Sequence, residues 1–167
     1  MTLNDQYVPS NVLPHSIRLT LRGESSALVV FARNVGLKNI AETGTRLDAL
    51  VSSSLIISIF GHDTPLHDGA IVIQEGRAIA AGCFLPLSEQ QDIRKSFGTR
   101  HRAALGLSEV ADSVVLIVSE ETGAISLAYD SKLYYGLGPD QARQRLGELL
   151  ELPEFAAAED EGEQRDG

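Results

Sequence analysis

Three loops in this sequence combine charged residues with glycine beside an apolar run, and the first of them, residues 65–70, reads Pro-Leu-His-Asp-Gly-Ala. A carboxylate followed by glycine where a strand begins can point into a cleft, while the glycine lets a ligand approach the backbone closely. Asp68 is the group in this loop that could take part in chemistry. Because Asp and Gly also dominate turns, a plain turn is the favoured interpretation of Asp68 and Gly69 on this motif alone.

The second loop, residues 97–104, reads Phe-Gly-Thr-Arg-His-Arg-Ala-Ala and suits an anion. Thr99 is a typical N-cap, and a helix behind it would present unpaired N–H groups and the positive end of its dipole. Arg100 and Arg102 add bidentate donors for phosphate oxygens. Their side chains would point about 200° apart on a helix, so we expect one to bind phosphate and the other to pair with a carboxylate, in the fold or across an interface. Two solvated arginines are the alternative.

The third loop, residues 119–123, reads Ser-Glu-Glu-Thr-Gly and follows an apolar run. Adjacent carboxylates at the end of a strand can bind Mg²⁺ or Mn²⁺ through oxygen, and Ser119 can donate to a phosphate. A solvated acidic turn is the plainer interpretation of this loop alone. Together, the three loops supply a carboxylate, an anion site and a metal ligand, which are the components of nucleotidyl or phosphoryl transfer.

The elements that must position these loops follow from the spacing of the apolar residues. Short apolar runs predict buried strands, at 27–31, 70–73, 78–84, 114–118 and 125–129. Helical spacing predicts three helices, at 48–60, 100–107 and 139–150. A tight turn is expected at 74–77, and residues 16–22 suit either a strand or one face of a helix.

Strands and helices alternate along the chain, but the turn at 74–77 is too short to join parallel strands. We therefore expect an α/β or α+β fold with a mixed central sheet flanked by helices. A chain of 167 residues has the length of one domain. We place this domain at 16–152, after a loosely tied arm at 1–15 and before an acidic, solvated tail at 153–167.

Charge and cysteine content exclude several classes of protein. The net charge is −9, of which the last twenty residues, with eight acids and one base, carry −7. An acidic chain without a basic stripe is a poor partner for nucleic acid or an anionic membrane. Cys83 is the only cysteine, which excludes an internal disulfide and a thiolate zinc cluster. The sequence has no signal peptide and no apolar run of membrane length, so we expect a cytoplasmic protein without a membrane segment.

Four stretches stand in a fixed order along the chain. They read Leu-His-Asp-Gly-Ala at 66–70, Cys-Phe-Leu-Pro-Leu-Ser at 83–88, Gly-Thr-Arg-His-Arg-Ala-Ala at 98–104 and Ser-Glu-Glu-Thr-Gly at 119–123. In this order and spacing they resemble the diadenylate cyclase domain family, and four ordered motifs are a specific signal. The resemblance covers about residues 27–133. It is strongest to the membrane-anchored housekeeping type, whose N-terminal transmembrane helices this sequence lacks.

The resemblance implies condensation of two ATP into cyclic di-AMP and two pyrophosphates. The two active sites would face each other in a homodimer, and larger homo-oligomers are compatible with this arrangement. Asp68 matches the family aspartate that lies near the 3′-hydroxyl of the nucleotide on the facing subunit. Glu121, together with His67, matches the side that binds Mg²⁺ or Mn²⁺. The other implied ATP contacts are Gly69, Phe84, Leu85, Gly98, Thr99, Arg100, His101, Arg102, Ser119 and Glu120.

Elementary chemistry agrees with these implied roles. A 3′-hydroxyl is a weak nucleophile, and an oriented carboxylate can accept its proton or hold it in line with the α-phosphorus. Two other functions stay open. The pair His67-Asp68 suggests a metal phosphohydrolase, although such pairs usually lie on helices and here a glycine and a β-branched run follow at once. A non-catalytic, adenine-nucleotide-binding regulatory module would keep the pocket without turnover.

Overall fold

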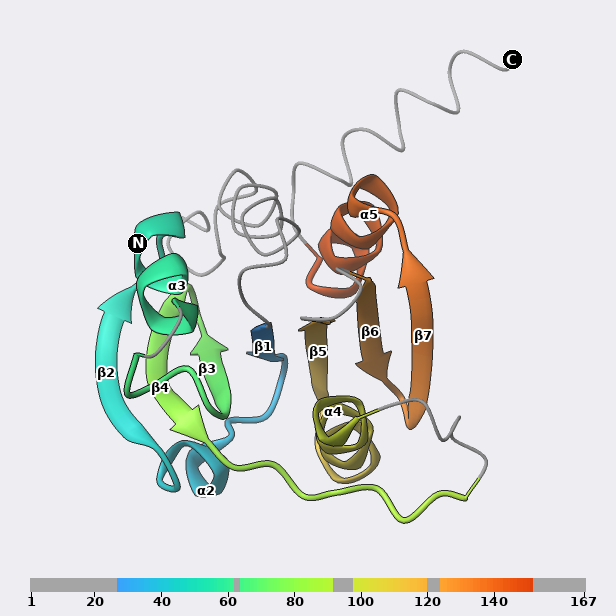
Figure 1. Ribbon diagram of the computed structural model, residues 1–167, viewed down its shortest axis with the longest axis horizontal. Helices are drawn as coiled ribbons and strands as arrows, with labels where there is room; N and C mark the ends of the chain where they lie inside the picture. The colour runs from blue at the N-terminus through green and yellow to red at the C-terminus, as the bar shows by residue number, and fades with distance from the viewer. Residues whose placement is uncertain (1–26, 62–63, 92–97, 120–123, 152–167) are drawn as a thin grey trace.

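The computed structural model describes residues 27–61, 64–91, 98–119 and 124–151 (Figure 1). Within them, seven strands form one sheet in the order β2-β4-β3-β1-β5-β6-β7. The strands are β1 (Ala27–Ala32), β2 (Thr45–Leu50), β3 (Ala70–Gln74), β4 (Arg77–Cys83), β5 (Ser113–Val118), β6 (Ile125–Tyr129) and β7 (Lys132–Leu137). The helices are α2 (Lys38–Ala41), α3 (Ser53–Phe60), α4 (Thr99–Val110) and α5 (Pro139–Leu149).

The sheet is mixed, as the sequence predicts. β1 runs parallel to β3, whereas β1–β5, β2–β4, β3–β4, β5–β6 and β6–β7 are antiparallel. The turn between β3 and β4 has its two central residues, Glu75 and Gly76, at φ values of 52° and 76°. Positive φ at both positions is the geometry of a two-residue hairpin turn, which confirms the predicted tight connection.

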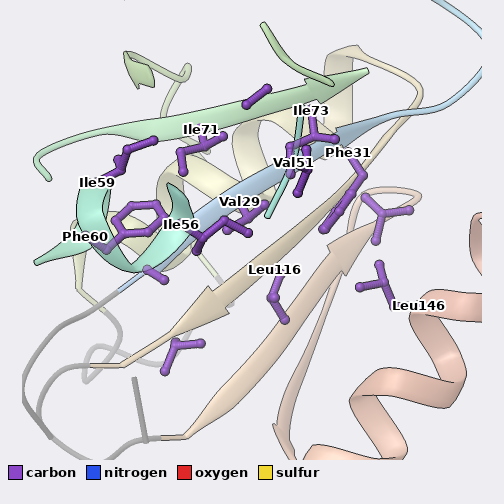
Figure 2. Close-up of a cluster of buried hydrophobic side chains, with 14 of the residues drawn as sticks. Val29, Phe31, Val51, Ile56, Ile59, Phe60, Ile71, Ile73, Leu116 and Leu146 are labelled. Carbon is purple, nitrogen blue, oxygen red and sulfur yellow. The ribbon is translucent and has the colours of Figure 1, made fainter. Parts of the chain in front are cut away.

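Helices cover both faces of the sheet (Figure 1). Side chains of the central strands alternate between the two faces: Val29 and Phe31 of β1 belong to the core under α3 and α5, and Leu28 and Val30 belong to the core under α2 and α4. Figure 2 shows α3 packing its apolar side chains against the first of these cores. The central strands are therefore buried on both faces, which explains why they are apolar without interruption.

The predicted helix at 48–60 is wrong in its first part. Residues 45–50 form the edge strand β2, which pairs with β4 from Thr45↔Ala81 to Leu50↔Arg77. Asp48 has φ 53°, which a helix does not allow, and Arg77 binds it through Nε to Oδ1 at 2.8 Å. The helix begins only after Ser52, whose Oγ accepts from the Leu55 N–H at 3.1 Å. Pairing with β4 thus overrides the helical spacing of the apolar residues.

Besides β2, two elements within the described residues were not predicted from the sequence, the one-turn helix α2 and the strand β7. β7 follows β6 through Asp130 and Ser131, both with positive φ, and this pair lacks the glycine that usually marks such a turn. The predicted arm at 1–15, the undecided segment at 16–22 and the acidic tail at 153–167 lie outside the described residues. The predicted domain boundaries therefore stay predictions.

Candidate functional site

Described residues from the first and third of these loops, and the end of β4, lie at one edge of the sheet. Asp68 and Gly69 stand directly before β3, whose first residue, Ala70, lies opposite the last residue of β4, Cys83. The parallel register of β1 with β3 sets Ala27 near the level of Gly69, and Ala27 pairs with Val118 at the end of β5. At this edge, Asp68 and the residue after Cys83 lie at the ends of neighbouring strands, and Ser119 lies two strands from Asp68, at about 5 Å per strand.

Gly69 is required where it stands. Its φ is 116°, and a Cβ there would lie 2.8 Å from the carbonyl carbon of Gly82 and 2.9 Å from the carbonyl oxygen of Cys83. The backbone before β3 is thus pressed onto the end of β4, which any side chain would prevent. Asp68, one residue earlier, is exposed and accessible to a ligand.

The chain that leaves β4 passes directly over α4. The Ser88 N–H donates to the Arg102 carbonyl at 3.0 Å, and the Ser88 hydroxyl donates to Glu109 at 2.5 Å. Gly106 of α4 lies so close to Pro86 that a Cβ would collide with the Pro86 carbonyl group. The segment at 84–88 and the helix that follows Gly98 are therefore one packed unit, although the sequence separates them.

At the start of this segment, the side chains of Phe84 and Leu85 differ in exposure. Phe84 is 68% exposed, a large value for an aromatic side chain. Leu85 is half-buried and packs against the core under α4. An exposed ring beside a fixed backbone is an arrangement that a flat apolar ligand can use.

The N-terminus of α4 differs in one detail from the prediction. Gly98 is the N-cap and Thr99 is the first helical residue, so the predicted capping role of Thr99 is wrong. Glycine has no side chain, so Gly98 makes no side-chain hydrogen bond to the first N–H groups of the helix. Arg100 and Arg102 are half-buried, and among the described residues neither forms a salt bridge.

His101 lies between these two arginines but faces the fold. Its side chain is only 7% exposed, and its ring centroid is 5.9 Å from that of Tyr135 on β7. Burial lowers the pKa of the His101 imidazole. This geometry suits a residue that seats α4 on the sheet, and the implied contact of its side chain with ATP stays a prediction.

The residues implied for the metal are only partly within the described chain. His67 is exposed, and its Nδ1 lies 2.5 Å from the Thr64 carbonyl oxygen, which can only accept; in the neutral imidazole this hydrogen bond selects the tautomer with a lone pair on Nε2. A histidine held in this way by a backbone carbonyl fits the usual arrangement of a metal ligand. Glu120 and Glu121 lie outside the described residues, and no cluster of three metal-binding side chains occurs in the part that is described.

Ser119 and Cys83 complete the edge. Ser119 is half-buried, and its N–H donates to the Ala124 carbonyl at 3.0 Å, which closes the loop between β5 and β6. Cys83 is buried at the end of β4, as expected for a small apolar residue, and burial raises the pKa of its thiol. Sequence reasoning missed Thr43, whose Oγ1 accepts from the Phe84 N–H at 2.9 Å. No local pattern could find it, because the two residues lie 41 positions apart.

Comparison with protein families decides the identity of this fold. The model of the family described as DisA bacterial checkpoint controller nucleotide-binding, abbreviated DAC, matches residues 16–133. The chain belongs to the DAC family. All four motifs of the sequence lie inside the matched DAC region.

Named relatives agree with the DAC assignment. The chain is 48% identical over 120 residues to the cyclic di-AMP synthase CdaA of Bacillus subtilis and 46% identical over 120 residues to a diadenylate cyclase of Listeria monocytogenes. Each match covers 72% of this chain and 44% of the relative, so the chain spans less than half the length of these two curated proteins.

A solved DAC structure shows the same fold. The crystal structure of DacA from Staphylococcus aureus, solved as a cysteine double mutant, matches with a TM-score of 0.82 at 40% identity. The match covers 84% of this chain and 94% of that one. Among the helices of the described residues, none is both long and apolar enough to cross a membrane.

Proposed function

We propose that this DAC domain is a diadenylate cyclase, which condenses two ATP into cyclic di-AMP and two pyrophosphates. The observation that supports this most is the meeting of Asp68, the 84–88 segment and the first turn of α4 at one sheet edge. A carboxylate, an exposed aromatic ring and a helix N-terminus with two arginines are the groups that a 3′-hydroxyl, an adenine and a triphosphate require.

Asp68 would act on the 3′-hydroxyl, and the other groups would hold the nucleotide. Phe84 and Leu85 would contact the adenine, and Gly69 would let the nucleotide approach the backbone. The first turn of α4 would bind the phosphates through its backbone N–H groups and its arginines. The remaining proposed phosphate-side contacts are Gly98, Thr99, Arg100, His101, Arg102, Ser119 and Glu120.

Mg²⁺ or Mn²⁺ would be held by His67, through Nε2, and by Glu121. The metal would neutralise charge that develops on the phosphates. The hydrogen bond between His67 Nδ1 and the Thr64 carbonyl supports this role, because it orients the imidazole. A hard cation favours oxygen ligands, and Glu121 would supply one.

Two copies of the chain would be needed for one product. Asp68 is exposed, so its carboxylate can reach a nucleotide bound to a facing copy. Closing a ring of two nucleotides needs two such attacks, and a two-fold homodimer supplies both with one interface. In this arrangement each copy holds one ATP and offers its aspartate to the other.

Incubation of the protein with ATP and either Mn²⁺ or Mg²⁺, followed by mass spectrometry of the products, tests the proposal. We expect cyclic di-AMP and pyrophosphate, at a rate per chain that rises with protein concentration because the active unit is a dimer. ADP or AMP alone would identify a phosphohydrolase instead. Bound but unchanged ATP would identify a regulatory nucleotide-binding module.

A further inference from the structure

Thr43, in the short connection between α2 and β2, holds the backbone at the point where β4 ends. Its hydroxyl donates to the Ile40 carbonyl at 2.6 Å and accepts from the Phe84 N–H at 2.9 Å. A hydroxyl has one proton, and the Ile40 carbonyl takes it. The lone pairs of Oγ1 are therefore oriented toward Phe84, and the direction of this hydrogen bond is fixed.

Phe84 needs this partner because its strand has ended. The last ladder position of β4 is Cys83, opposite Ala70. A backbone N–H beyond the end of a strand has no neighbour to receive it and must bind water or a side chain. Thr43 takes the place of the missing strand neighbour, so the chain keeps one defined path past the sheet edge.

Gly44 permits this close approach. A Cβ at Gly44 would lie 2.6 Å from the Cys83 Sγ and 3.0 Å from the Cys83 N, and it would collide with the Ala81 carbonyl oxygen. The Cys83 Sγ in turn lies 3.9 Å from the Ala41 carbonyl oxygen. The connection from α2 to β2 is thus packed against the end of β4 at several points.

We propose that Thr43 is a positioning residue for nucleotide recognition, which acts through the backbone of Phe84 and Leu85. The proposal rests on the proposed function, since it assumes that these two residues meet the adenine. Among the described residues, the side-chain hydrogen bonds of Thr43 go to Ile40 and Phe84 and not to α4, on which the phosphate side is built. Loss of the Thr43 hydroxyl should therefore weaken recognition of the base and leave recognition of the phosphates intact.

The test compares Thr43→Val, which keeps the shape and removes the hydroxyl, with Thr43→Ser, which keeps the hydroxyl. Thr45→Val, at an exposed position on β2, is the matched control for the same exchange. The dissociation constants of ATP and of inorganic tripolyphosphate are measured by calorimetry, each without a divalent metal so that no cyclic di-AMP forms. The KM and kcat of cyclic di-AMP formation are measured in parallel.

We expect Thr43→Val to raise the ATP dissociation constant and KM by about two- to tenfold, the range for one lost hydrogen bond, with a smaller change in kcat. Tripolyphosphate binding should be unchanged, and Thr43→Ser and Thr45→Val should resemble the wild type. Equal ATP affinity in Thr43→Val and wild type, or a parallel loss for both ligands, overturns the proposal.

Two further comparisons keep the result clear. If Thr43→Val does not fold, Thr43→Ala removes the same hydroxyl with less bulk, and the same expectations apply to it. If the wild type binds ATP but forms no cyclic di-AMP, the proposed function fails. The affinity ratio between ATP and tripolyphosphate then still decides the role of Thr43.

Discussion

The β1–β5 and β3–β4 pairs are both buried, yet they differ in regularity. Six consecutive residue pairs join β1 to β5 without a break, from Ala27↔Val118 to Ala32↔Ser113. The β3–β4 ladder shifts register twice, and two glycines with positive φ, Gly69 and Gly82, stand at its site end. Bulges of this kind redirect the chain beside active sites. The regular pair supports the sheet, and the irregular pair aims Asp68 and Phe84.

The largest expected effect comes from the aspartate at the irregular pair. Asp68→Asn should keep ATP binding and lower the rate of cyclic di-AMP formation by about 10²- to 10⁴-fold, because an amide cannot accept the proton of the 3′-hydroxyl. Product formation is measured by mass spectrometry and ATP affinity by calorimetry. Asp130→Asn, in the exposed turn between β6 and β7, is the matched control and should be active. Undiminished turnover in Asp68→Asn would contradict the proposed role of this carboxylate.

The second effect separates the two glycines of the irregular pair. Gly69→Ala combines a φ of 116° with a collision against the backbone of Gly82 and Cys83. It should lower the free energy of unfolding by at least about 1–3 kcal/mol and should also lower the activity. Gly82→Ala has φ 67° and only ordinary contacts near its Cβ, so its cost should be lower, about 1 kcal/mol. Urea denaturation measures both. Equal losses of unfolding free energy in the two variants would show that backbone strain alone, and not the close approach of β3 to β4, destabilises them.

The sequence predicts the regular pair more fully than the irregular one. The runs at 27–31 and 114–118 are apolar and β-branched, and buried strands of this type leave little choice of structure. The positive φ of Gly82 and the register shifts of β3 depend on how β3 meets β4, which no local pattern contains. For the same reason residues 48–50, whose spacing suits a helix, form part of an edge strand when β4 is beside them.

The candidate site was predicted in its residue types and not in its internal contacts. The motifs and the family resemblance named Asp68, Phe84 and the first turn of α4 as site residues, and these roles stay predictions. Motif spacing did not find that Ser88 binds the backbone of Arg102, because this contact depends on the path of a loop across a helix. It also missed Thr43, a residue whose importance comes only from its distance to Phe84.

A third, smaller effect concerns the regular pair. Ile117 on β5 is completely buried, and Ile117→Val removes one methylene group, which should cost about 0.5–1.5 kcal/mol of unfolding free energy. Because β5 supports the site without contacting the nucleotide, the kcat and KM of the folded variant should match those of the wild type. A combined urea denaturation and kinetic measurement checks both statements. A change in KM comparable with that of Thr43→Val would mean that the regular pair also tunes the site.

The smallest effect is a pH dependence, which tests how His101 and Tyr135 hold α4 on β7. Burial against Tyr135 lowers the pKa of His101 below its ordinary value of 6.5. Below about pH 6.5 the unfolded chain then binds more protons at this residue than the folded chain, so its contribution to stability is complete above that pH and is lost as the pH falls. His101→Phe keeps an aromatic ring against Tyr135 and removes the titrating group. Its melting temperature should therefore decline less than that of the wild type between pH 7.5 and pH 5.5, roughly the range in which histidine titrates. If the melting temperatures of the variant and the wild type decline in parallel with pH, the proton uptake belongs to other groups. In that case apolar contacts with β5 and β6 hold α4 on the sheet.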